Sequence, residues 1–420
     1  MKRKNIVSFL LVLVMCAAVI GGGNFDIRRG ERQAFREINC NGQYVYAASA
    51  GVASQSARYA SVHGSGKFNY LDNTIIESSA RGSAVIEITT GQVLYSHNGT
   101  KVLPMASTTK ILTALVVIEN VKNLDEVLTT HPKAVGIEGS SAYLQQGEKL
   151  TVRDVLYGLM LVSGNDCAYA LAIHTAGSVE KFSEMMNESA RRAGATNSNF
   201  TNPHGLHCDN HYTTPIDLAK ISAAAMQNDT FKQIASTKQH KAPWQDRTYP
   251  RVFNNKNKLL RLYDGADGVK TGFTKKSGRC LVSSATREGL EIAVVVLNCG
   301  DMWEESIRLL DKAFANFELN TILRANTSTG ELAVKNGKRG VIQTYTKESF
   351  TLPQKKDAPL NIQLKKNFKK VSAPVKINQK VGTLSVYKNE QQIFETNIYS
   401  LEEVKQEKTT KRLFGCKFIA

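Results

Sequence analysis

The chain has 420 residues, of which 42% are hydrophobic and 22% are charged, with 30 glycines and 9 prolines. This composition is that of a globular protein, and it excludes a disordered chain, a collagen-like chain and a protein with many membrane spans. The length allows roughly two to three domains of ordinary size.

The net charge of +17 is unevenly distributed along the chain. Residues 1–80 contribute +4, residues 81–320 contribute +2 and residues 321–420 contribute +11. A nucleic-acid-binding protein would carry its basic side chains over the functional region, whereas the middle of this chain is nearly neutral. We therefore expect no nucleic-acid partner, and the basic C-terminal part indicates contact with an anionic surface.

Residues 1–25 have the pattern of a signal peptide or an N-terminal anchor. Three basic residues at 2–4 precede an apolar run at 6–20, which is short for a membrane-spanning helix. The sequence therefore predicts export, and it leaves the cleavage site open between the small residues at 17–18 and those at 48–50. Residues 26–78 predict a flexible spacer, because Ala, Ser or Gly fill 14 of the 20 positions at 47–66.

The folded part is expected to begin near Ser79. Residues 84–88 and 92–95 predict a hairpin around Gly91, and a strongly apolar, buried helix is expected from 107 to about 119. Further helices are expected at 151–161, where Thr151 and Asp154 form a capping box, and at 179–193 and 215–226.

Strand patterns return at 269–273, 280–286 and 291–297, and a helix is expected from 302 to 317. Strands at both ends with helices between them predict an α+β domain at 79–320, in which distant segments complete one antiparallel sheet beside a helical subdomain. Short alternating runs at 321–400 predict a small all-β domain, and residues 401–420 form a basic tail.

Seven cysteines stand at positions 16, 40, 167, 208, 280, 299 and 416. Their scattered spacing is not that of a disulfide framework, so we expect most of them to be free or buried. Cys167 follows a candidate active-site residue, Asn165, by two positions, and we interpret it as a core residue.

Three short motifs carry the chemistry. Ser107 and Lys110 stand at the start of the apolar helix, where a spacing of three places the hydroxyl and the amine on one face. A lysine desolvated against an apolar helix can lose its proton and act as the base for a serine nucleophile, and the free N–H groups of a helix start can stabilise an oxyanion. Alone this pattern is weak, because a capping serine followed by an exposed lysine is common.

The other two motifs are Ser163-Gly164-Asn165 in a loop, 56 residues after Ser107, and Lys270-Thr271-Gly272 on an expected strand, 107 residues after Ser163. Each triplet is unremarkable by itself. The three in this order, on a helix start, a loop and a strand, are the set found in penicillin-binding proteins and class A β-lactamases.

With these motifs the sequence resembles a low-molecular-mass penicillin-binding protein of the serine-type D-alanyl-D-alanine carboxypeptidase family, peptidase S11. The residues around the motifs are similar to that family as well, namely 104–106, Asp166, 202–206 and 211–214. The resemblance covers about residues 80–320 and implies a β-lactamase/transpeptidase-like fold, and the basic β segment resembles the family's C-terminal domain. Residues 26–78 have no counterpart.

The resemblance implies an enzyme of the cell wall or of the outer face of the cytoplasmic membrane. It would remove the C-terminal D-alanine from peptidoglycan stem pentapeptides through an acyl-enzyme and so regulate cross-linking, with β-lactams as covalent inhibitors and with no metal or other cofactor. The implied roles are Ser107 as the nucleophile, Lys110 as its general base, Ser163 as a proton relay, Asn165 as the ligand of the substrate amide, Lys270 and Thr271 as ligands of the terminal carboxylate, Gly272 as a point of close backbone approach, and the backbone N–H groups of Ser107 and Phe273 as the oxyanion hole.

Two other functions of the three motifs remain open. A class A β-lactamase would need a glutamate in an E-x-x-L-N segment between the second and third motifs, and the nearest match, Glu184 to Asn187, lies in an expected helix. A non-catalytic penicillin-binding or wall-binding module would usually have lost a motif residue, and none is missing here.

Two further features allow other interpretations. Four potential zinc ligands, His204, His207, Cys208 and His211, stand close together, but they match no H-E-x-x-H helix. We prefer a loop whose histidines hydrogen-bond to the backbone. The tail after Glu402 combines basic and large apolar residues, which suits either an anionic membrane surface or a solvated end.

Overall fold

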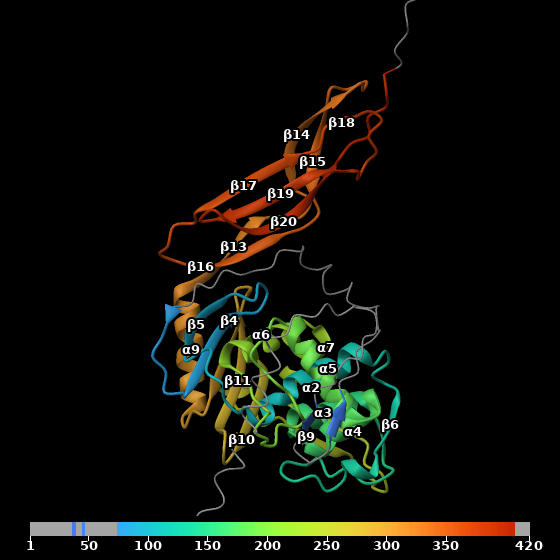
Figure 1. Ribbon diagram of the computed structural model, residues 1–420, viewed down its shortest axis with the longest axis vertical. Helices are drawn as coiled ribbons and strands as arrows, with labels where there is room; N and C mark the ends of the chain where they lie inside the picture. Colours follow the sequence, from blue (N-terminus) through green and yellow to red (C-terminus); the bar gives the residue numbers. More distant parts are fainter. Residues whose placement is uncertain (1–35, 39–43, 47–73, 408–420) are drawn as a thin grey trace, which may run out of the picture. The chain divides into compact units, whose positions relative to one another are not determined.

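The computed structural model describes residues 36–38, 44–46 and 74–407 (Figure 1). The expected signal segment, most of the expected spacer and the end of the basic tail lie outside the described residues. Two short strands, β1 (Arg36–Ile38) and β2 (Tyr44–Tyr46), pair antiparallel within the segment for which a spacer is predicted. Among the helices of the described part, none is long and apolar enough to cross a membrane.

A six-stranded sheet organises the chain from Thr74 to Leu297. Its strand order is β10-β11-β12-β4-β5-β3, and every pair except β3 with β5 is antiparallel. Strands from the two ends of this region therefore lie side by side, as predicted. The strands are β3 (Thr74–Ile75), β4 (Gly82–Glu87), β5 (Val93–His97), β10 (Ala266–Thr274), β11 (Gly278–Arg287) and β12 (Leu290–Leu297).

Both faces of this sheet are buried. On β12, Ala293 and Val295 belong to one apolar core, whereas Val294 and Val296 belong to another, because successive side chains of a strand point to opposite faces. Helix α9 (Met302–Asn316) covers the second core, and the helical region covers the first. Figure 1 shows α9 on one side of the sheet and the larger group of helices on the other, whereas Leu259, from the short helix before β10, belongs to the second core with α9.

Helices fill the region between β5 and β10. A 3₁₀ turn at Ala106–Thr109 leads into α2 (Lys110–Asn120), which is buried from Lys110 to Val117 as its apolar sequence predicts. Thr151 accepts a hydrogen bond from the N–H of Asp154 and so caps α3, as the capping box predicts. The remaining helices are α3 (Val152–Leu161), α4 (Asn165–Ala176), α5 (Val179–Arg192), α6 (Pro215–Met226), α7 (Asp229–Ser236) and α8 (Leu259–Leu262).

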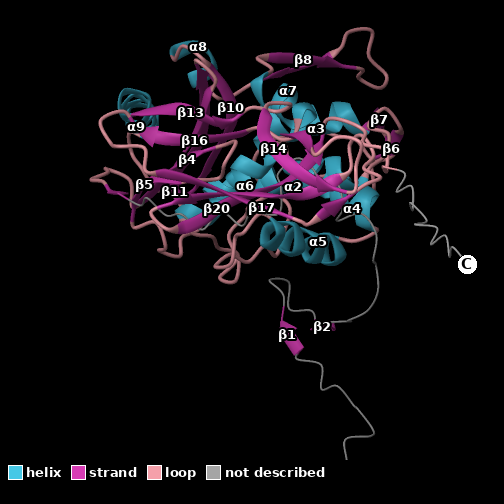
Figure 2. Ribbon diagram, turned by 90° about the horizontal axis from the view of Figure 1, so that it is seen from above, coloured by secondary structure: helices cyan, strands magenta, loops and turns pink. Residues whose placement is uncertain are grey.

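Two short antiparallel strand pairs border these helices, with contacts to α3 and α4. Neither pair was predicted, because each strand has only three or four residues and little apolar alternation. The strands are β6 (Val127–Thr129) with β7 (Lys149–Thr151), and β8 (Gln239–Ala242) with β9 (Arg251–Asn254). Figure 2 shows β6 and β7 beside α4.

From Phe317 onward the described chain is built from strands, as predicted. β13 pairs with β16, and a second sheet has the order β17-β19-β20-β15-β14-β18. These strands enclose an apolar core of their own, which includes Val375, Val381 and Ile398. The strands are β13 (Phe317–Leu323), β14 (Ser328–Lys335), β15 (Val341–Thr346), β16 (Phe350–Lys355), β17 (Ile362–Phe368), β18 (Val371–Ser372), β19 (Lys380–Lys388) and β20 (Gln391–Ser400).

Candidate active site

Ser107 and Lys110 stand where the 3₁₀ turn passes into α2. Ser107 is half-buried, whereas the Lys110 side chain is 0% exposed. The Lys110 Nζ lies 3.0 Å from the Ser107 Oγ, 2.7 Å from the Asn165 Oδ1 and 2.7 Å from the backbone carbonyl oxygen of His204. The amine is therefore fixed between one hydroxyl and two carbonyl oxygens.

The surroundings of Lys110 disfavour its charged form. Burial is the main cause that lowers the pKa of Lys110 well below its usual range, and the positive charge of Lys270 acts in the same direction. The negative charge of Asp166 opposes this shift, and the positive charge of Lys256 adds to it. The surroundings of Lys110 thus favour the uncharged form of the amine that lies beside the serine hydroxyl.

The second motif connects α3 with α4. Ser163 has a left-handed backbone with φ of 64° and is 4% exposed, and Asn165 is the first residue of α4. The Asn165 side chain bridges two segments, because its Oδ1 accepts from Lys110 and its Nδ2 donates to the carbonyl oxygen of Glu138 at 2.5 Å. This arrangement fixes the amide orientation of Asn165.

Asp166 organises the loop beside this motif. Its buried carboxylate accepts hydrogen bonds from the N–H groups of Ala142, Leu144 and Cys167 and from the hydroxyl of Ser141. Sequence reasoning noted Asp166 only for its resemblance to family residues. Its place in the first turn of α4 could have indicated a structural carboxylate, because negative charge is favourable at a helix start.

The third motif lies on β10. Lys270 is 1% exposed, and burial, followed by the charge of Lys256, lowers its pKa to about 7. Its Nζ donates to the carbonyl oxygen of Thr271 at 2.9 Å. A Cβ atom on Gly272 would lie 3.0 Å from the backbone nitrogen of Ser107, so a glycine is needed where β10 packs against the serine turn. The next residue, Phe273, is 64% exposed.

The structure thus brings parts of all three motifs together. Hydrogen bonds join Ser107, Lys110 and Asn165, and Gly272 contacts the backbone of the serine turn. Within the described part of the chain, no hydrogen bond joins the side chain of Ser163 or Thr271 to Ser107.

The loop that carries His204 and His211, called the histidine loop below, contacts the buried amine of the site through the carbonyl oxygen of His204. The Nδ1 of His204 accepts the N–H of Leu206, and the Nδ1 of His211 accepts the N–H of Thr201, as the preferred interpretation of this loop expects. Burial lowers the pKa of both histidines, that of His211 to about 3, so both are neutral at pH 7. Across the described residues, no group of three His, Cys, Asp or Glu side chains is arranged to hold a metal ion.

Among the described cysteines, Cys167, Cys280 and Cys299 are free and buried, whereas Cys208 is disulfide-bonded. Cys167 is 0% exposed, and its Sγ fills the space next to Gly158 and Gly164. Cys167 is therefore a core residue, as the sequence predicts.

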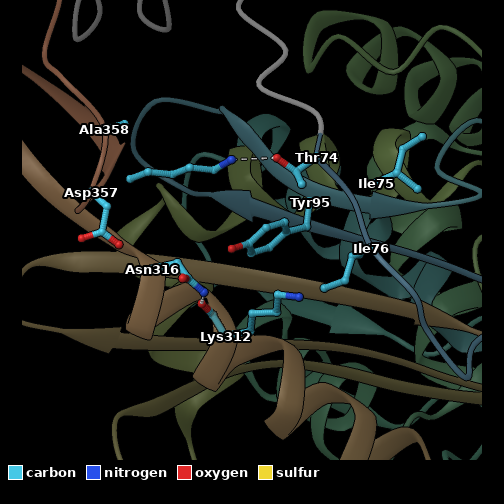
Figure 3. A pocket seen from close by; sticks show the side chains of 9 residues that line it. Thr74, Ile75, Ile76, Tyr95, Lys312, Asn316, Asp357 and Ala358 are labelled. Carbon is cyan, nitrogen blue, oxygen red and sulfur yellow. Dashed lines mark hydrogen bonds between the residues drawn. The ribbon is translucent and has the colours of Figure 1, made fainter.

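A pocket of about 320 Å³ lies elsewhere (Figure 3). The Nζ of Lys355 donates to the Oγ1 of Thr74 at 3.0 Å beside this pocket. None of its lining residues belongs to the three motifs, so it is separate from the serine site. The lining consists of Thr74, Ile75, Ile76, Tyr95, Lys312, Asn316, Lys355, Asp357 and Ala358.

The fold and the site together define a class of protein. An antiparallel sheet between helices, with a serine and a buried lysine at a helix start facing a Lys-Thr-Gly strand, is the arrangement of penicillin-recognising serine enzymes. A family model described as D-alanyl-D-alanine carboxypeptidase matches residues 71–300, and one described as penicillin-binding protein 5, C-terminal domain, matches residues 317–406. The chain belongs to the D-alanyl-D-alanine carboxypeptidase family, S11, whose members are serine-type hydrolases.

Known relatives agree with this assignment. The D-alanyl-D-alanine carboxypeptidase DacF of Bacillus subtilis is 32% identical over 78% of this chain and 86% of its own length. The D-alanyl-D-alanine carboxypeptidase of Streptomyces sp. K15 is 38% identical over 52% of this chain and 80% of its own length. The solved structure of penicillin-binding protein 5 from Haemophilus influenzae has a TM-score of 0.65 at 28% identity, covering 79% of this chain and 99% of that one.

Proposed function

We propose that this protein removes the C-terminal D-alanine from peptidoglycan stem pentapeptides through an acyl-enzyme on Ser107. The observation that carries this proposal is the placement of the buried Lys110 amine 3.0 Å from the Ser107 hydroxyl. By consuming pentapeptide, the reaction would limit the donors available for cross-linking.

The partners of Lys110 support its role as the general base. A neutral amine has two N–H donors and one lone pair, and the two carbonyl oxygens at 2.7 Å can only accept. They take the two N–H groups, so the lone pair is left for the third partner, the O–H of Ser107. Lys110 then accepts the serine proton as Oγ attacks the carbonyl carbon of the penultimate D-alanine.

The remaining motif residues bind the substrate and assist the departure of the product. Asn165 binds the peptide amide, and Lys270 with Thr271 binds the terminal carboxylate on β10, where Gly272 keeps that strand close to the serine. The backbone N–H groups of Ser107 and Phe273 stabilise the oxyanion. Ser163 relays the proton that Lys110 has taken from Ser107 to the leaving amine of D-alanine. Water then hydrolyses the ester on Ser107 and returns a proton to its Oγ.

β-Lactams would acylate the same serine, because their amide carbonyl is attacked in the same way. Slow release of that adduct is expected, since the glutamate of class A β-lactamases has no evident counterpart. Glu184, the nearest match in the sequence, is exposed on α5, where the described structure shows no hydrogen bond between it and Ser107 or Lys110.

The pH dependence of kcat/KM tests the role of Lys270. Its pKa in the free enzyme is lowered to about 7, so the cation that binds the substrate carboxylate disappears as the pH rises through 7. We expect kcat/KM for a peptide ending in D-Ala-D-Ala to fall on the alkaline side of about pH 7. Lys270→Arg stays charged and should remove this alkaline limb. A wild-type profile that stays flat from pH 6 to 9 would contradict the assignment.

We further propose that the protein acts outside the cytoplasm and that its basic tail contacts the anionic face of the membrane. Residues 408–420 carry four basic and no acidic residues, which supports this contact. A variant that ends at Glu407 should bind vesicles containing anionic lipid more weakly than the full chain in a sedimentation assay, with neutral vesicles as the control. Equal binding of both forms would refute the tail contact.

A further inference from the structure

We propose that Lys256, which lies outside the three motifs, is a positioning residue of this active site whose ammonium group sets the charge balance around Lys110 and Lys270. This inference rests on the proposed carboxypeptidase reaction. Lys256 stands between β9 and α8, and neither its neighbours in sequence nor its spacing from the motifs marks it as a site residue.

Two contacts fix Lys256 beside the second motif. Its backbone N–H donates to the carbonyl oxygen of Leu161 at the end of α3, and its Nζ lies 3.2 Å from the Ser140 Oγ. The Ser140 carbonyl in turn accepts the backbone N–H of Asn165 at 2.7 Å, and the Asn165 Oδ1 accepts from Lys110. Three hydrogen bonds, linked through Ser140 and Asn165, therefore connect the Lys256 ammonium group with the buried Lys110 amine.

The groups that act on Lys110 show why the charge of Lys256, beside that of Lys270, matters there. From α4 come Asp166 and Cys167, from β10 comes Lys270, and from the histidine loop come His204 and His211. Both histidines are neutral, and burial raises the pKa of the Cys167 thiol well above its usual range, so that thiol is neutral as well. Asp166 is then the single negatively charged group among those that act on Lys110, and the positive charges of Lys270 and Lys256 act against it.

Lys256 acts on both motif lysines in the same direction. Its charge contributes to lowering the pKa of Lys110 and the pKa of Lys270, and burial lowers the pKa of Lys256 itself. A nearby positive charge favours the neutral amine of Lys110, which the acylation step uses. The same charge makes Lys270 lose its proton, and with it its positive charge, at a lower pH. We therefore expect the position of the whole pH–rate profile to depend on a residue whose side chain, within the described structure, forms no hydrogen bond with Ser107 or with β10.

The test is the pH profile of kcat/KM for D-alanine release by full-length Lys256→Gln, Lys256→Arg and wild type. Without the positive charge the pKa of both motif lysines rises, so both limbs of the Lys256→Gln profile should move to higher pH by about half a unit. On the acidic limb this corresponds to a rate loss of about threefold at fixed pH. Lys256→Arg keeps the charge and should keep the wild-type profile.

Lys258→Gln is the matched control, because this lysine is also exposed and lies two residues further along the same segment. Its profile should match that of the wild type. High salt should reduce the shift of Lys256→Gln, because an exposed charge is screened. The proposal would be overturned if both limbs of the Lys256→Gln profile stayed at their wild-type pH values, or if the Lys256→Arg profile showed the same shift as that of Lys256→Gln.

The rate of acylation by benzylpenicillin at each pH separates the two proposals. If the wild type forms the adduct without releasing D-alanine, the carboxypeptidase function fails, whereas the acidic limb of acylation still reports the effect of Lys256 on Lys110. If D-alanine is released normally and neither limb moves, the function stands and the role of Lys256 is wrong.

Discussion

Replacing Lys110 with methionine is expected to lower the second-order rate constant for acylation by benzylpenicillin by about 10³-fold, the order of a general-base contribution. The amine is the group within hydrogen-bond distance of the Ser107 Oγ that can accept its proton, since Asn165 and the His204 carbonyl contact Lys110 and not the serine. Stopped-flow acylation and thermal unfolding of the variant, measured together, separate loss of the base from loss of the fold.

A second variant, Lys110→Arg, distinguishes the base from a merely positioning amine. Arginine retains N–H donors for the two carbonyl oxygens but does not give up its proton in a protein. It should therefore be as inactive as Lys110→Met. The control is Lys258→Met, which alters an exposed lysine outside the three motifs and should acylate like the wild type. A loss of less than tenfold in Lys110→Met would refute the role of this residue as the base.

Asp166→Asn is expected to destabilise the protein by about 3 kcal/mol, because a buried carboxylate that accepts four hydrogen bonds is replaced by a group with one acceptor and one donor. The amide NH₂ would face donors. The loop that holds Ser140 and Glu138 against Asn165 would then lose its anchor, so acylation should slow as well. Urea unfolding measures the first effect, and acylation kinetics measure the second.

Ser141→Ala is the matched comparison for this prediction. It removes one of the four donors to Asp166 and leaves the carboxylate in place, so a cost of about 1 kcal/mol is expected. If Asp166→Asn cost no more than Ser141→Ala, the carboxylate would not be the anchor of this loop.

The parts of the fold with a regular apolar pattern were predictable from the sequence. The apolar run of α2, the capping box of α3 and the strands that became β10 to β12 are confirmed. Helix α4 was missed because its apolar residues do not form a one-sided stripe: several of them, such as Ala168, Ala170 and Leu171, are buried on different sides. Its start coincides with the second motif, which the sequence indicated as a loop.

The site was predictable where chemistry depends on residue type and spacing. A spacing of three at a helix start places a serine and a lysine on one face, and the structure places their side-chain atoms 3.0 Å apart. The contribution of the His204 carbonyl oxygen was not predictable, because a backbone group leaves no sequence signal. The position of Lys256 depends on how the segment after β9 lies against α3, which is a property of the tertiary fold.

Intact-protein mass spectrometry after incubation with benzylpenicillin tests the central claim most directly. A Ser107→Ala variant is measured beside the wild type, and D-alanine release from a diacetyl-Lys-D-Ala-D-Ala peptide is assayed in parallel. We expect a persistent single adduct that is absent from Ser107→Ala, together with D-alanine release by the wild type. An adduct without D-alanine release, rapid turnover of penicillin, or an adduct that persists in Ser107→Ala would contradict the proposed serine carboxypeptidase.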